Sequence, residues 1–334
     1  MQIQCLEEFS RRVQTGEYRF RKEPCPCGSS TASVKISEVD RYGLPLDSVL
    51  CRECGTVRVD PYLDEQSLSD FYSNLYQDMY ARATDVADYF HRQTDKTTRV
   101  LATYEGRLPP SASILDVGCG AGGGIWFFQQ RGFQTAACDY DRALIEYGRS
   151  RGVSNLILGS IAELRSQYPG WSFDLIYLYH VFEHVIDPVG LLNELKTVLK
   201  PDGRVLIIVP DISQVGISKW PGGDVLQFMH LAHKYNYSRE GLRKMAQIAG
   251  LHAGSVAPAN HQPVSRCPEL WIEFGTSLAK HPQCAIPPTS AGDEMLRNLR
   301  QTERLYRLGC CPAQIIQATA AAKSKPDTRR RDSA

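Results

Sequence analysis

Between residues 111 and 256 short apolar runs alternate with amphipathic stretches. The apolar runs predict strands at 113–116, 134–138, 156–158, 173–178 and 204–209, and the stretches between them predict helices at 123–130, 142–149, 161–167 and 188–199. A further helix at 239–249 and a strand from 252 to 256 follow. Strands that alternate with helices are typical of a parallel sheet, so we expect an α/β domain here.

Two features support the helix starts in this domain. Asp187 and Pro188 suit the N-cap and first turn of the helix at 188–199, and Ser238 can cap the helix at 239–249.

Beyond residue 257 the periodic pattern weakens into a proline-rich chain, with one more helix predicted around 293–308. The tail at 320–334 has no apolar period and is basic, so we expect it to be disordered.

The most informative run is Ile114–Gly124, where an apolar strand ends in Asp116 and a glycine turn opens a helix. Such turns bring backbone N–H groups close to a ligand at a helix N-terminus. Gly118, Gly120 and Gly123 satisfy the G-x-G-x-x-G pattern, and Asp139 lies at a suitable distance to hold a ribose, so a nicotinamide dehydrogenase is one alternative. Asp116 favours a different cofactor, because a carboxylate there would repel a pyrophosphate and attract the ammonium and sulfonium of S-adenosylmethionine.

The segment Asp116–Gly120 resembles the first motif of class I methyltransferases, and the resemblance extends over residues 111–256. It implies a Rossmann-like class I methyltransferase sheet with S-adenosylmethionine as cofactor. Asp116 and the backbone around Gly118, Cys119 and Gly120 would face the methionine part. Asp139 would accept both ribose hydroxyls and Tyr140 would lie against the adenine.

One cofactor position departs from the family pattern. Many relatives have an acid after the third strand that accepts from the adenine amine, and this chain has Ser160 followed by Ile161. We therefore expect Ser160, or a backbone group at Ser160 and Ile161, to make the adenine contact.

Candidate catalytic histidines follow the fourth strand. The segment Tyr179–Val185 resembles the H-x-x-E-H-V segment of many class I enzymes, which would face the transferable methyl group. Methyl transfer is an in-line displacement, and a hydroxyl or carbon acid must also lose a proton, a task that suits histidine. We expect His180 to be the base, with His233 as second choice, and interpret His184 as either catalytic or a structural histidine.

The same H-x-x-E-H pattern matches a zinc-protease motif. We do not favour that interpretation, because the segment begins a loop after a buried strand and the sequence shows no third ligand.

The segment Leu231–Ser238 resembles the substrate loop of zinc-containing nucleotide-sugar methyltransferases, in which an acid and a histidine precede an aromatic stretch. His233 matches the histidine. Ala232 stands in the acid's place, so we do not transfer a carbon-methylating reaction and expect a sugar or glycan hydroxyl as acceptor.

Four cysteines near the N-terminus form two pairs, Cys25-x-Cys27 and Cys51-x-x-Cys54, each followed by glycine. With the strand-like stretch at 33–39 between them, they indicate a zinc ribbon whose four thiolates bind one structural Zn²⁺. The first spacing is tighter than usual, and the alternative is four unmetallated cysteines in a small β module.

The expected organisation is a zinc-ribbon module with an aromatic segment at 1–80, a linking helix at 81–110, the cofactor domain at 111–256, a C-terminal extension that is irregular and helical at 257–319, and the tail at 320–334. The aromatic segment contains Phe71, Tyr72, Tyr76 and Tyr80. We interpret most of these rings as packing residues and one or two as a lid over the cofactor.

Composition adds limits to this picture. The chain has 334 residues, 43% hydrophobic and 22% charged, with a net charge of +1. That balance gives no global field to recruit nucleic acid. No run approaches the ~20 apolar residues of a membrane span and the N-terminus lacks a signal-peptide pattern, so we expect a cytoplasmic protein. Eleven cysteines in a reducing compartment fit metal ligands and core residues better than disulfides.

The leading hypothesis is therefore a zinc-ribbon, S-adenosylmethionine-dependent methyltransferase that acts on a sugar-containing small molecule or glycan precursor. One alternative is RNA methylation, in which the ribbon would bind the RNA, although the module's acidic residues offset its basic ones. The second alternative is a non-catalytic binding protein that keeps the methyltransferase fold.

Overall fold

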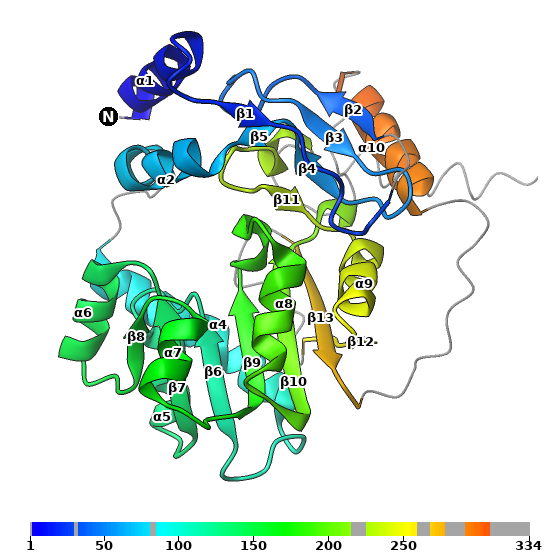
Figure 1. Ribbon diagram of the computed structural model, residues 1–334. Helices are drawn as coiled ribbons and strands as arrows, with labels where there is room; N and C mark the ends of the chain where they lie inside the picture. Colours follow the sequence, from blue (N-terminus) through cyan, green and yellow to red (C-terminus); the bar gives the residue numbers. More distant parts are fainter. Residues whose placement is uncertain are drawn as a thin grey trace, which may run out of the picture.

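A seven-stranded sheet forms the centre of the computed structural model, which describes residues 2–29, 33–80, 85–214, 225–258, 268–277 and 291–307. The strand order is β12-β13-β10-β9-β6-β7-β8 (Figure 1). Its strands are β6 (Ser113–Val117), β7 (Gln134–Asp139), β8 (Leu156–Leu158), β9 (Phe173–Tyr179), β10 (Leu199–Pro210), β12 (His252–Ser255) and β13 (Glu269–Gly275). The five strands β8, β7, β6, β9 and β10 run parallel to one another, whereas β13 runs antiparallel to both β10 and β12.

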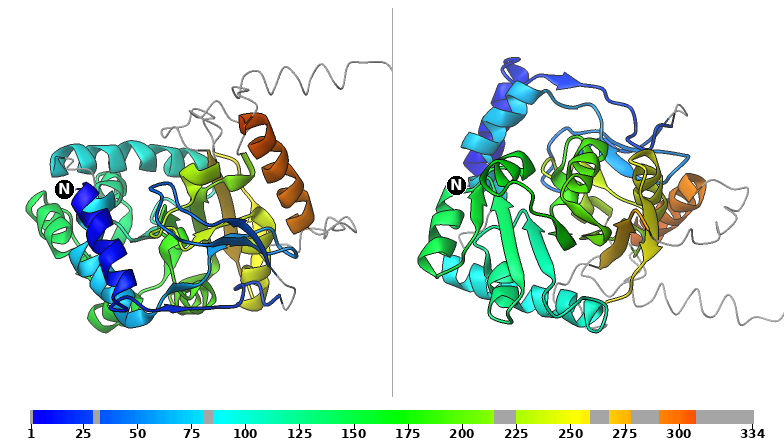
Figure 2. Two further views of the ribbon diagram at one scale, coloured as in Figure 1. Left: turned by 90° about the horizontal axis from the view of Figure 1, so that it is seen from above. Right: turned by 60° about the horizontal axis from the view of Figure 1, so that its bottom comes forward.

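Helices cover both faces of this sheet, as the alternation in the sequence predicts (Figure 2). One face packs against α4 (Val86–Tyr104), α5 (Gly123–Gln129) and α6 (Arg142–Ser150). The other face packs against α7 (Ile161–Gln167), α8 (Pro188–Lys196) and α9 (Arg239–Ile248). The expected caps of α8 and α9 are confirmed, since Asp187 accepts from the amide of Gly190 and Ser238 from that of Gly241.

The N-terminal module lies across the end of the sheet where β9 and β10 finish (Figure 1). Its elements are α1 (Gln2–Gln14), β1 (Phe20–Arg21), β2 (Val34–Ser37), β3 (Ser48–Leu50), β4 (Val57–Val59), β5 (Tyr62–Leu63), α2 (Glu65–Asn74) and α3 (Tyr76–Tyr80). Its larger sheet has the order β11-β4-β3-β2, in which β11 (Tyr235–Asn236) comes from the segment after β10. The module's sheet is therefore completed by the cofactor domain.

Two later segments do not follow the expected division of the chain. β13 lies inside the extension expected at 257–319, yet it pairs with β10 over six registered residue pairs from Val205 to Pro210. A domain boundary at residue 256, as expected from the sequence, would therefore separate β13 from the sheet to which it belongs. α10 (Ala291–Arg307) packs against the N-terminal module, where Met295, Leu296 and Leu299 share a core with Leu50 and Val57.

Some expectations fall outside the described residues, namely the tail at 320–334 and the proline-rich stretches at 259–267 and 278–290. Within the described ranges, no helix combines the length and apolar character needed to cross a membrane.

Candidate functional site

The glycine loop after β6 is enclosed by two other segments. Gly118 and Gly120 have φ angles of +75° and +53°, which glycine adopts without strain. A Cβ on Gly118 would collide with the side chain of Val181, in the segment after β9. A Cβ on Gly120 would lie 2.6 Å from the Tyr89 hydroxyl of α4. The loop therefore lies between α4 and the segment that carries the candidate histidines.

Asp116 lies beneath this loop, with only 4% of its surface exposed. Its Oδ2 accepts a 2.6 Å hydrogen bond from the hydroxyl of Tyr177. Burial raises the pKa of Asp116 to about 7, against the effect of that hydrogen bond. A nearby cation would favour its ionised form, so the expected interaction with the cofactor's positive charge is compatible with this position and stays a prediction.

The predicted ribose and adenine residues lie at the ends of β7 and β8. The carboxylate of Asp139 accepts from the amides of Gly120 at 2.7 Å and Asp141 at 2.9 Å. Tyr140 is 78% exposed, as a ring available for stacking would be. Ser160 caps α7, accepting from the amide of Ala162 and donating to Glu163. Its hydroxyl proton is engaged in this cap, and its adenine contact stays a prediction.

Sequence reasoning missed two side chains of α4 at the glycine loop, Tyr89 and Gln93. Gln93 donates to the carbonyl of Cys119 at 2.5 Å and accepts from the amide of Gly123 at 3.3 Å. Their four-residue spacing puts them on one helix face, which was the only sequence signal available. Gln93 thus holds both ends of the turn.

His180 lies directly after β9, in the left-handed backbone conformation with φ +55°. Its Nε2 lies 3.4 Å from Oε1 of Glu269, on β13. Burial acts to raise the pKa of Glu269, but the neighbouring His180, the hydrogen bond from Tyr179 and the charge of Arg99 lower it to about 2. Glu269 also accepts from Arg99 at 2.6 Å. A buried carboxylate thus orients the histidine that we expect to be the base.

The other two candidate histidines lie close together. Nδ1 of His184 is 2.7 Å from the carbonyl oxygen of Ala232, and the rings of His184 and His233 have their centroids 4.9 Å apart. One ligand atom from each of Glu183, His184 and His233 lies within 4.8 Å of the other two. His233, from a segment distant in the sequence, thus lies beside Glu183 and His184, whereas His180 is not part of this group.

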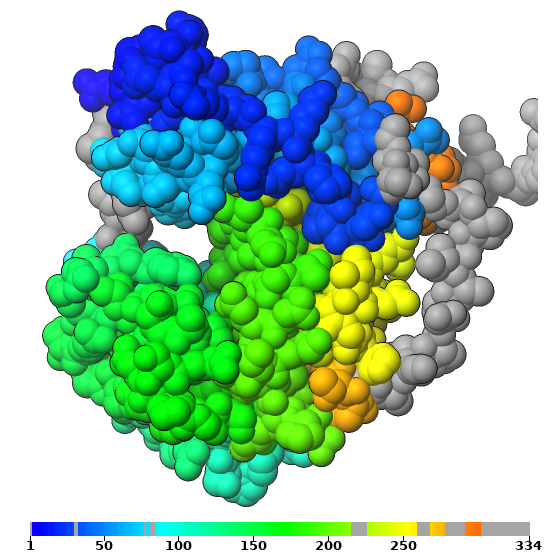
Figure 3. Space-filling model, viewed as in Figure 1, coloured from blue at the N-terminus to red at the C-terminus, as the bar shows by residue number. Residues whose placement is uncertain are grey.

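The aromatic segment faces this histidine group. The rings of Tyr80 and His230 have their centroids 5.0 Å apart, and His230 lies against His233 with centroids 3.7 Å apart. Burial raises the pKa of Tyr76, and the charges of Glu183 and Asp139 both add to this shift. Tyr76 therefore lies within electrostatic range of both the ribose acid and the histidine group. Figure 3 shows a hollow between α2 and the part of the cofactor domain that carries α6.

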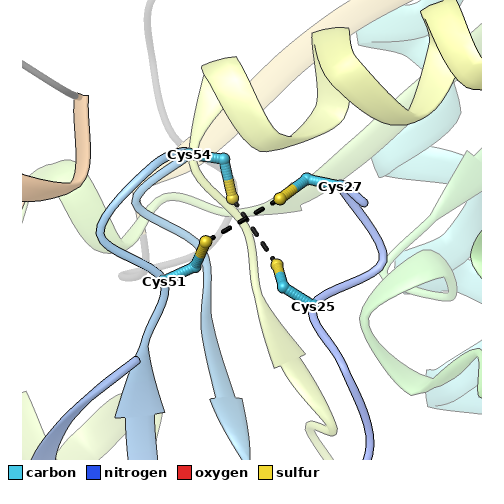
Figure 4. Close-up of side chains that lie close together, drawn as sticks. All are labelled: Cys25, Cys27, Cys51 and Cys54. Atoms are coloured by element: carbon cyan, nitrogen blue, oxygen red, sulfur yellow. Dashed lines mark hydrogen bonds between the residues drawn. The ribbon is translucent and has the colours of Figure 1, made fainter. Parts of the chain in front are cut away.

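All four cysteines of the N-terminal module point toward one centre (Figure 4). The Sγ atoms of Cys25 and Cys54, and those of Cys27 and Cys51, are 3.7 Å apart, and all four side chains are buried. Sulfur ligands at about 2.3 Å from a tetrahedral zinc would be about 3.8 Å from one another. The donor set therefore fits Zn²⁺, including the tight Cys25-x-Cys27 pair, and a closed set of four thiolates indicates a structural role.

Comparison with known proteins agrees with the fold. Residues 87–255 match the family described as "Methyltransferase domain". The C-methyltransferase NovU of Streptomyces niveus is 25% identical over 245 residues, covering 69% of this chain and 56% of that protein. The ubiquinone biosynthesis O-methyltransferase of Xanthomonas campestris is 30% identical over 103 residues, covering 29% of this chain and 43% of that protein.

Among solved structures, an S-adenosylmethionine-dependent methyltransferase from Clostridium acetobutylicum is 15% identical, with a TM-score of 0.39, covering 62% of this chain and 98% of that one. The chain spans between 21% and 56% of the length of the first curated relatives that it matches. The matched family region covers just over half of the chain, from the linking helix α4 through β12. The chain therefore belongs to the methyltransferase domain family and has its Rossmann-like class I fold.

Proposed function

We propose that this protein transfers the methyl group of S-adenosylmethionine to a hydroxyl of a sugar-containing small molecule or glycan precursor. The contact between Gly118 and Val181 supports this most directly. It brings the segment with His180 and His184 against the loop that would hold the cofactor. An acceptor bound beside these histidines would lie next to the transferable methyl group.

His180 is the proposed general base. Glu269 lies beside Nε2 and stabilises the imidazolium that forms when a proton is taken from the acceptor. His180 is also 25% exposed at its side chain, so an acceptor can reach it. His184 is fixed by its bond to the carbonyl of Ala232, which supports a positioning role instead.

The sugar acceptor is supported by the surroundings of the histidines. Tyr72, Tyr76 and Tyr80 offer flat apolar faces with hydroxyls, which suit a sugar ring. Within the part of the chain that the structure describes, the buried hydroxyls of Tyr72 and Tyr80 have no hydrogen-bond partner. Ala232 contributes no acid here, so the proposed reaction is on oxygen, although NovU carries the name of a C-methyltransferase.

The module's basic side chains argue against RNA as the acceptor. Arg58 is 5% exposed and pairs with Asp60 at 3.0 Å, while Arg52 pairs with Asp293 at 3.0 Å. Arg21 pairs with Glu23 at 2.7 Å. The buried Arg58 is poorly available to phosphates, and the carboxylates beside Arg21 and Arg52 offset the positive charge of these half-exposed side chains. We also propose a cytoplasmic location, because free thiolates that hold zinc need a reducing compartment.

Calorimetry with zinc-replete protein tests the cofactor, and incubation with S-adenosylmethionine and a panel of nucleotide sugars tests the acceptor. We expect heat of binding for S-adenosylmethionine and for its demethylated product, and a product heavier by one methylene unit. Nuclear magnetic resonance then separates an O-methyl from a C-methyl product. Absence of binding for both cofactor forms would reject the proposed function.

A further inference from the structure

The carboxylate of Glu183 is buried without a hydrogen bond. Its residue is 1% exposed, and within the described part of the chain neither Oε1 nor Oε2 has a hydrogen-bond partner. Lys96 is near enough for their charges to interact, but this attraction supplies no hydrogen bond. A buried carboxylate that lacks partners costs free energy, which indicates that a group outside the chain completes this site.

His184 presents a ligand nitrogen beside this carboxylate. A carbonyl oxygen can only accept, so Nδ1 of His184 carries the proton and donates it to Ala232 at 2.7 Å. In the neutral ring Nε2 then keeps its lone pair. Histidines that bind metals are commonly fixed in one tautomer by such a bond from the other ring nitrogen.

His233 supplies a second nitrogen from the segment between β10 and β11. Nδ1 of His233 is buried and, among the described residues, has no hydrogen-bond partner.

We propose that Glu183, His184 and His233 bind a divalent first-row transition metal ion, separate from the zinc of the four cysteines. Their ligand atoms lie within 4.8 Å of one another. Two imidazoles and one carboxylate suit zinc, iron, cobalt or manganese, and three protein ligands leave positions open for other oxygen atoms.

The open positions would bind hydroxyl oxygens of the acceptor, a role that rests on the proposed function. A metal-bound hydroxyl loses its proton more readily. In that reaction the proton passes to His180, the acceptor oxygen bonds to the methyl carbon, and the bond from this carbon to the sulfonium breaks to release S-adenosylhomocysteine. Metal binding by itself needs neither cofactor nor acceptor.

Cobalt titration tests the site. Protein whose four cysteines hold one equivalent of zinc is freed of excess metal and titrated with Co²⁺ in a calorimeter, while the absorption of cobalt–thiolate bonds is followed. We expect one further metal per chain without thiolate absorption. Glu183→Gln and His233→Asn should each weaken this binding at least about tenfold, the size of effect seen even for residues that only support a metal ligand.

The matched control is His91→Asn, which changes an exposed histidine of α4 and should bind cobalt as the unchanged protein does. Retained zinc and an unchanged circular dichroism spectrum report whether each variant is folded. Lack of cobalt binding by the unchanged protein overturns the proposal, whatever the variants do. Equal binding by the unchanged protein and a folded Glu183→Gln variant overturns it too. Cobalt binding without methyl transfer to any sugar would reject only the proposed function.

Discussion

The amide of Val59 donates a 3.1 Å hydrogen bond to the carbonyl oxygen of Lys234, the residue that follows His233. Strand β4 of the N-terminal module and the segment that carries a candidate catalytic histidine therefore share one sheet. Tyr62 adds a second link, because its hydroxyl donates to the carbonyl of Leu231 at 3.0 Å. The module that holds the four cysteines is thus coupled to the candidate site through these two hydrogen bonds.

This coupling predicts that Cys51→Ser lowers activity as well as stability. Loss of one thiolate should abolish stoichiometric zinc, reduce the free energy of unfolding by at least about 2 kcal/mol and lower the Tm by about 4 °C or more. Metal analysis, thermal unfolding and methyl transfer measure these effects. Cys5→Ser is the control, since Cys5 is buried in α1 away from the cluster and should keep its zinc. A Cys51→Ser protein with full activity but no zinc would contradict the coupling.

The position of Asp116 predicts a pH-dependent affinity for the cofactor. Its pKa is about 7, so the carboxylate becomes ionised as the pH rises through neutrality. The sulfonium of S-adenosylmethionine should therefore bind up to about tenfold more tightly at pH 8 than at pH 6, if binding lowers this pKa by about one unit. S-adenosylhomocysteine, whose sulfur is neutral, should show a smaller change.

Calorimetry over this pH range measures both ligands. Asp116→Asn should remove the difference between them, because its side chain does not ionise. Equal pH dependence for the two ligands in the unchanged protein would argue against a direct role for the charge of Asp116.

Two glycine substitutions separate backbone strain from collision. Gly118→Ala would place a Cβ against Val181 at a φ of +75°, and Gly132→Ala would place one in open space at a φ of +81°. Strain alone costs about 1 to 2 kcal/mol. We expect both variants to lose this stability in urea unfolding, and only Gly118→Ala to lose cofactor binding in addition. Similar cofactor affinities for the two variants would show that the Gly118 contact does not shape the site.

The lowered pKa of Glu269 predicts that replacing this residue changes the free energy of unfolding by an amount that depends on pH. A carboxyl whose pKa is lowered from 4.5 to about 2 stabilises the folded state above the unfolded value, and this contribution is lost as the pH falls from about 4.5 toward 2. Glu269→Gln should therefore cost about 3 kcal/mol at pH 7 and much less at pH 3. Urea unfolding at several pH values measures this cost. Glu194 is exposed, so the control variant Glu194→Gln should change the free energy of unfolding by no more than about 0.5 kcal/mol. A constant cost at all pH values would indicate lost packing instead.

His180→Asn tests the proposed base. Asparagine tolerates the left-handed backbone conformation at this position, so the fold should be retained. We expect kcat to fall by about 10²- to 10⁴-fold while the affinity for S-adenosylmethionine stays within a few fold. The His184→Asn variant loses the fixed tautomer but keeps the base, so its kcat should fall less. A His180→Asn enzyme with normal kcat would reject His180 as the base.

The sequence predicted the α/β domain well, because burial on both faces of a parallel sheet leaves a regular apolar pattern. It also identified the four cysteines, whose spacing is local. Glu269 was missed because β13 follows a proline-rich stretch and pairs with β10 across a long separation in the chain. The grouping of His233 with Glu183 and His184 was missed for the same reason, since their proximity depends on how β11 joins the module.

The pairing of β11 with β4 also bears on how this protein can be divided for study. A fragment comprising residues 1–80 would leave the hydrogen-bonding edge of β4 open and uncover the apolar side chains of Val57 and Tyr62, which are almost fully buried in the whole chain. Open strand edges bordered by apolar groups promote self-association. Such a fragment should precipitate even when loaded with zinc, so domain swaps with relatives would need to carry β11 and α10 along with the cysteines.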